Sequence, residues 1–90
     1  MSKRTSEVIA VVEAYVSELR EQLPFVETEI DSIKGTDVYL RVMMPPEQWD
    51  EEYGAVSELT SSLNYRYWND TDVFIVSIIV TKQPEGAHHG

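Results

Sequence analysis

Apolar residues recur at every third or fourth position near the start of the chain, as on one face of a helix. Glutamates occupy the opposite face, so the segment is amphipathic. Pro24 disfavours helical geometry at Leu23 and ends the pattern. We therefore predict a helix over residues 6–22. Its apolar face is formed by Val8, Val12, Tyr15, Val16 and Leu19.

Two stretches with an alternating pattern follow, at residues 25–33 and 38–44. Alternation with a period of two is typical of half-buried strands, and the Lys-Gly-Thr-Asp segment between them has turn chemistry. The two stretches therefore predict a β-hairpin. If both apolar sets face one core, Ile30 pairs with Val42, and a three-residue loop is centred on residues 35–37. Asp31 then lies opposite Arg41 on the outer face.

The second half of the chain resembles the first. An apolar stripe with helical spacing, which starts after two prolines, predicts a second helix over residues 47–63. Residues 65–68 predict a short aromatic strand, residues 69–72 a turn, and residues 73–81 a last strand. The polar segment 82–90, which includes His88 and His89, predicts a loose tail.

These elements predict an α+β fold in the order α-β-β-α-β-β, with a four-stranded antiparallel sheet and both helices packed on one face. The chain has 90 residues, which suits one domain, and we assign residues 1–81 to it. Cysteine is absent, so there is no disulfide framework and the hydrophobic core must hold the fold together.

The side chains that point away from the predicted helices form an unusually apolar set. Arg66 should not face the core, so in the second hairpin it points outward together with Trp68, and the odd-numbered residues of the last strand follow them. Exposed apolar patches with aromatic, Met and Arg residues are typical of protein interfaces. The predicted partner-binding residues are Tyr39, Arg41, Met43, Arg66, Trp68, Val73, Ile75 and Ile79.

The composition adds a second hypothesis. The chain has 16 acidic and 7 basic residues and a net charge of −9, which argues against a duplex nucleic acid as partner. An acidic surface around the start of the second helix would suit a basic partner, so an acidic inhibitor or nucleic-acid mimic is an alternative function. Salt should weaken such binding and leave apolar docking almost unchanged. The acidic surface consists of Glu47, Asp50, Glu51 and Glu52.

Several kinds of chemistry find little support in the residues. The only histidines, His88 and His89, lie in the predicted tail, so we expect no catalytic residues, metal site or cofactor. A platform for single-stranded nucleic acid on the same sheet face is disfavoured by Glu27, Glu29 and Asp31. The longest apolar run is too short to cross a membrane, and we expect a cytoplasmic protein.

We therefore predict a non-enzymatic protein–protein interaction or assembly module that docks through its open sheet face. A homodimer is the commonest form of such an assembly. A small enzyme or enzyme subunit stays open as a further alternative, because a groove between two copies could supply the concave site that so short a chain lacks.

Overall fold

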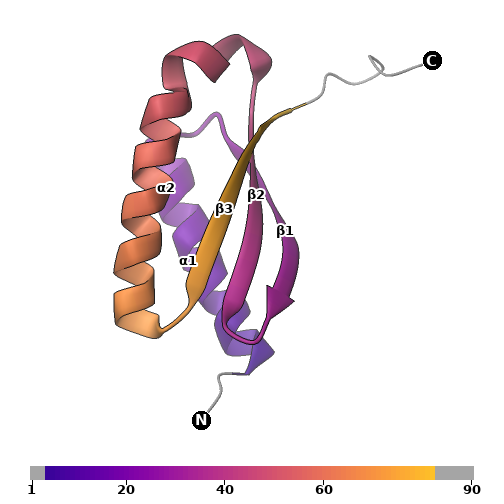
Figure 1. Ribbon diagram of the computed structural model, residues 1–90, viewed down its shortest axis with the longest axis vertical. Coiled ribbons are helices and arrows are strands. Elements are labelled where there is room, and N and C mark those ends of the chain that lie inside the picture. Colours follow the sequence, from indigo (N-terminus) through magenta and orange to yellow (C-terminus); the bar gives the residue numbers. More distant parts are fainter. Residues whose placement is uncertain (1–3, 83–90) are drawn as a thin grey trace, which may run out of the picture.

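The structure is a computed structural model that describes residues 4–82 of the chain. Residues 83–90 of the predicted tail, with His88 and His89, lie outside this described part. Two helices, three strands and one 3₁₀ turn follow one another along this described part (Figure 1). The elements are α1 (Thr5–Gln22), β1 (Glu27–Lys34), β2 (Asp37–Met44), η1 (Pro46–Gln48), α2 (Trp49–Thr71) and β3 (Phe74–Thr81).

Helix α1 follows its sequence pattern closely. Val8, Val12, Tyr15 and Leu19, which are spaced three or four residues apart, are all buried. At the start of the helix, the Glu7 carboxylate accepts a hydrogen bond of 2.9 Å from the backbone N–H of Arg4. The prediction of an amphipathic helix here is confirmed, with one residue added at its start.

Strands β1 and β2 form the predicted hairpin in a different register. The turn has two residues rather than three, because Lys34 pairs with Asp37 and Gly35 adopts a φ of +64°. A glycine in this region is what a two-residue hairpin turn requires at its first position. Ile30 consequently pairs with Leu40 and not with Val42, and a β-bulge at Asp31 absorbs the shift.

Helix α2 is eight residues longer at its C-terminal end than predicted, since it ends at Thr71 and not at residue 63. The predicted strand at residues 65–68 is therefore wrong, as is the separate turn at residues 69–72. Val56, Thr60 and Leu63 are buried and Tyr67 packs on the same core, so one helical stripe continues through the aromatic segment. The helix ends where Asp72 adopts a left-handed φ of 63°.

The sheet has three strands in the order β1-β2-β3, and the predicted four-stranded antiparallel sheet is wrong. Strands β1 and β2 are antiparallel, but β3 runs parallel to β2 because α2 carries the chain back across the sheet. A hairpin reverses direction in a few residues, whereas parallel neighbours need a crossover of a dozen or more. The extended helix makes that crossover and uses up the segment assigned to a fourth strand.

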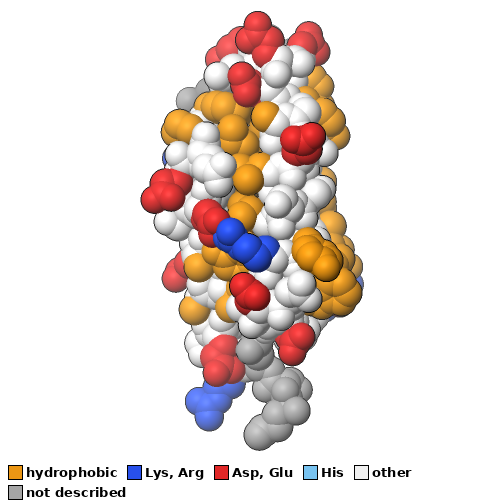
Figure 2. All heavy atoms as spheres, turned by 90° about the vertical axis from the view of Figure 1, so that its left-hand side faces the viewer, with side chains coloured by type: hydrophobic (Ala, Val, Ile, Leu, Met, Phe, Trp, Pro, Cys, Tyr) orange, Lys and Arg blue, Asp and Glu red, His pale blue; other side chains and the backbone are white. Residues whose placement is uncertain are grey.

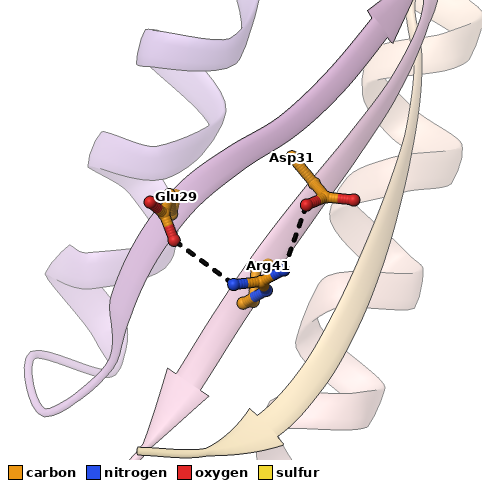
Figure 3. A network of polar contacts seen from close by, with 3 residues as sticks. All are labelled: Glu29, Asp31 and Arg41. Carbon is orange, nitrogen blue, oxygen red and sulfur yellow. Dashed lines mark hydrogen bonds and ion pairs between the residues drawn. The ribbon is translucent and has the colours of Figure 1, made fainter.

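The core lies between the sheet and the two helices. On β2, Val38, Leu40, Val42 and Met44 are buried, while the intervening residues are exposed or half-buried. The hydroxyl of Tyr15 joins the layers, since it donates to the backbone carbonyl of Thr60 at 3.2 Å and lies 2.7 Å from Oγ of Ser77. Both helices lie behind the sheet in Figure 3, so the other face of the sheet has no cover from them.

The glycine within α2 has no structural role that explains it. Gly54 is exposed, its φ is not in the left-handed region, and a Cβ atom there would meet no other atom within 4 Å. We expect Gly54→Ala to raise the free energy of unfolding by about 0.5–1 kcal/mol, because alanine loses less backbone entropy in a helix. Urea unfolding followed by circular dichroism measures the change.

The control for this substitution is Gly35→Ala in the hairpin turn. Space around Gly35 is equally open, but its φ is +64°. Alanine there should destabilise the protein by about 1–2 kcal/mol, because the left-handed conformation is costly for a residue with a Cβ. Equal effects of the two substitutions would contradict the conformational explanation.

Candidate functional site

The candidate site is the sheet face that points away from both helices, here called the outer face. Every second pair in register places β2 and β3 side chains together on it, as with Tyr39 and Val76, or Met43 and Val80. None of the apolar side chains on this face is buried, and Ile78 is 40% exposed. We call the contiguous set the apolar strip. It consists of Tyr39, Met43, Phe74, Val76, Ile78 and Val80.

The strand β3 contributes the opposite set of residues from the one predicted. Val73 and Ile75 are fully buried, and Ile79 packs against the core, so the three do not belong to the outer face. Because side chains alternate along a strand, a shift of one residue exchanges the two faces. The prediction was wrong because it placed β3 by pairing it with an aromatic strand that is in fact helical.

Arg66 and Trp68 lie on the last turns of α2 and not on the sheet. Arg66 pairs with Glu18 of α1, and the Tyr67 hydroxyl donates to the same carboxylate at 2.9 Å. The hydrogen bond from Arg66, and to a lesser extent that from Tyr67, lowers the pKa of Glu18 below its usual value. Arg66 therefore helps to join the two helices, and its predicted place on the docking face is wrong.

Trp68 nevertheless stays close to the apolar strip. Its indole is half exposed and packs edge-on against Phe74 at a ring-centroid distance of 5.2 Å. Figure 2 views the molecule from the α2 side, and hydrophobic side chains gather along its right-hand margin, which is the front of Figure 1. Trp68 thus extends the apolar surface from β3 onto the end of α2.

The β1 side of the outer face is charged. The Arg41 guanidinium bonds to Asp31 at 3.0 Å and to Glu29 at 3.5 Å (Figure 3). The expected contact between Asp31 and Arg41 therefore forms, although Arg41 is in register with Glu29. Lys82 pairs with Glu27 in the same way. Two cations thus offset part of the charge of the three carboxylates beside the apolar strip.

A shallow hollow lies at one end of the apolar strip. Its volume is about 550 Å³, and it is lined by Met43, Ile78 and Val80 together with Arg41, Thr81 and Lys82. The lining thus combines apolar side chains with two cations. Such a surface can accept an apolar side chain from a partner, but it contains no nucleophile paired with a base.

The predicted acidic surface occupies the beginning of α2. Asp50, Glu51 and Glu52 lie in the first turn of α2, and Glu47 lies in η1 just before it. Carboxylates at this position are stabilised by the positive end of the helix dipole. Their arrangement is explained by the helix itself, and they are separate from the outer face.

Within residues 4–82, potential metal ligands are dispersed and one titratable side chain is fully buried. Within this range no three His, Cys, Asp or Glu side chains come together as metal ligands would. The buried titratable group is Tyr15, whose pKa is raised to about 12, mainly by burial. No helix in the described part is long and apolar enough to cross a membrane.

Four members of the apolar strip were missed from the sequence: Phe74, Val76, Ile78 and Val80. Every residue of β3 except Ser77 and Thr81 is apolar, so the strand itself does not show which face is buried. The one polar side chain inside the run, Ser77, faces the core and contacts Tyr15.

Comparison with known protein families, curated proteins and solved structures finds no match to this chain.

Proposed function

We propose that this protein is a non-enzymatic assembly module that self-associates through the outer face of its sheet. One observation carries the proposal: six adjacent apolar side chains cover two neighbouring strands, and neither helix covers them. Contiguous apolar surfaces of this kind typically mark protein interfaces. A cytoplasmic location stays a prediction from the sequence.

A second copy of the chain suits this surface better than its net charge of −9 suggests. Three carboxylates beside the apolar strip share two cations, Arg41 and Lys82, so a second copy would meet a surface whose negative charge is partly offset. An apolar strip is complementary to itself, and a two-fold axis parallel to the strands would place the acidic β1 strands on opposite sides of the interface. This arrangement keeps like charges apart.

Sedimentation velocity over a concentration series tests the proposal. We expect the wild type to form a dimer, and Ile78→Asp to weaken it at least about tenfold, because a carboxylate would be buried in the interface. Ile30→Asp is the matched control, since Ile30 is 39% exposed and Ile78 is 40% exposed, but Ile30 lies on the helix side of the sheet. A wild type that stays monomeric, or equal effects of both substitutions, would contradict the proposal.

Salt distinguishes this proposal from the acidic-binder alternative. Contacts between exposed charges weaken as the screening length falls to about 8 Å at physiological ionic strength and lower still above it. Association through the apolar strip should change little when salt is raised, whereas binding through Glu47, Asp50, Glu51 and Glu52 should be lost. A steep loss with salt would favour the acidic surface.

A further inference from the structure

A second open surface lies on the helix side of the sheet, between α1 and β1. This groove has a volume of about 680 Å³. Val12 and Leu40 form its floor and are buried, while Val16 and Ile30 stand higher on its two walls. Ile30 is 39% exposed although its partner in register, Leu40, is 1% exposed. The helices therefore leave the inner side of β1 incompletely covered.

Strand β1 is also an edge of the sheet, and Figure 1 shows no helix or strand of residues 4–82 beyond it. The β2–β3 ladder is bounded by hydrogen bonds from Phe74 N–H to the Thr36 carbonyl and from Lys82 N–H to the Met44 carbonyl. Even-numbered residues of β2 therefore direct their backbone groups to β3, and odd-numbered ones direct theirs to β1.

The register then identifies the free backbone groups of β1. Glu27 and Glu29 pair with the odd-numbered residues Met43 and Arg41, so their backbone groups are turned toward β2. Those of Thr28 and Ile30 are directed to the open edge. The same two residues line the groove with their side chains, so the backbone edge and the apolar groove form one continuous site.

The charged side chains around this site are mostly negative. The carboxylates of Glu27, Glu29 and Asp31 are on the outer side of β1, and they remain about half exposed or more despite their ion pairs. On the α1 side, Glu13 and Glu21 line the groove with one cation, Arg20. A second β1 strand would bring like charges together, whereas a strand with basic residues would find partners.

We propose that β1 and the groove bind an extended segment of a partner protein in which apolar and basic residues alternate. The segment adds to the sheet as a strand beside β1 and hydrogen-bonds to the backbone of Thr28 and Ile30. Its apolar side chains enter the groove against Val16 and Ile30. Its Lys or Arg side chains lie on the outer side, next to Glu27 and Glu29.

A suitable probe is a peptide with capped termini in which valine and lysine alternate. It is about eight residues long, to match β1. Fluorescence anisotropy of the labelled peptide should show binding to the wild type. Two control peptides test the charge and the alternation. In the first, glutamate replaces lysine, and in the second, all valines precede all lysines. We expect both to bind at least about tenfold more weakly. Equal binding of either control would overturn the proposal.

Two variants with matched exposure locate the site. Ile30→Lys places a cation in the groove and should weaken binding at least about tenfold, whereas Ile78→Lys on the outer face should leave it unchanged. Circular dichroism of each variant verifies that it is folded. Equal loss in both variants would overturn the proposal, and because the peptide assay does not depend on dimer formation, its outcome is separate from that of the sedimentation experiment.

Hydrogen exchange measured by NMR tests strand addition itself. The amide protons of Thr28 and Ile30 should become protected, with exchange slowed at least about tenfold, when the lysine peptide is added. Those of Glu27 and Glu29 already face β2 and should change less. Peptide binding without protection at residues 28 and 30 would overturn the proposed mode of binding.

Discussion

Replacing Tyr15 by alanine is expected to destabilise the protein by about 3–5 kcal/mol, the usual cost of removing a large buried aromatic side chain. Tyr15 is fully buried, and its hydroxyl contacts both α2 and β3. A domain of this size has little stability to lose, so the variant should be largely unfolded at room temperature. Circular dichroism and urea unfolding measure the loss.

The control is Tyr15→Phe, which keeps the ring and removes the hydroxyl. It should cost about 1–2 kcal/mol, because the carbonyl of Thr60 and the hydroxyl of Ser77 lose a partner. The pKa of Tyr15 is raised from 10.0 to about 12. The protonated Tyr15 side chain therefore contributes its full stabilisation below pH 10, where the side chain is neutral in the unfolded protein as well. This contribution to the free energy of unfolding is lost as pH rises toward 12.

The free energy of unfolding of the wild type should accordingly fall by about 2–3 kcal/mol more than that of Tyr15→Phe over this alkaline range. Tyr67, whose pKa is also raised, contributes equally in both proteins and so cancels in the comparison. Thermal unfolding at a series of alkaline pH values provides the measurement. The same slope with pH in both proteins would show that Tyr15 is more open to water than the structure indicates.

Ile75→Asp should unfold the protein, whereas Ile78→Asp should leave its monomer nearly as stable as the wild type. Ile75 is fully buried and Ile78 is 40% exposed, although both lie on β3. A carboxylate without a partner in the core costs more than about 4 kcal/mol, while the same change on an open strand face costs about 1 kcal/mol or less.

This pair of variants tests the orientation of β3 directly. Unfolding should be measured at protein concentrations low enough that no dimer adds to the stability of the wild type. The antiparallel hairpin expected from the sequence would give the reverse order, with Ile75→Asp tolerated and Ile78→Asp unfolded. That outcome would contradict the parallel pairing of β2 and β3.

The first half of the fold was predictable because each pattern there is local. Helix α1 has buried residues at every third or fourth position, and Pro24 marks its end. The hairpin shows alternation on both strands and a glycine in its turn. Only the register was wrong, because a β-bulge changes the pairing without leaving a distinctive residue pattern.

The prediction for the second half of the chain was wrong at one short segment. The strand at residues 65–68 was predicted from three aromatic residues in a run of four, which is too short to distinguish a strand from a helix. The longer stripe formed by Val56, Thr60, Leu63 and Tyr67 has helical spacing, but Thr60 interrupts its apolar character. Thr60 is accommodated in the core because its hydroxyl donates to the backbone carbonyl of Val56 at 2.9 Å.

That single error also changed the predicted site. The strand β2 was assigned correctly, so Tyr39, Arg41 and Met43 lie on the outer face as expected. The residues of β3 were inverted, because their orientation depended on the supposed second hairpin. An open apolar face was thus predicted in general, but four of the six residues of the apolar strip are neighbours along β3 of the residues predicted.

The parallel pairing of β2 with β3 has a consequence for how the chain reaches its native state. The two strands are separated by the whole of α2, a helix of 23 residues, so the residues that pair in their ladder are far apart in the sequence. Contacts this distant in sequence slow folding. During synthesis the N-terminal part emerges first, and its hairpin and α1 must wait for the last strand to complete the core.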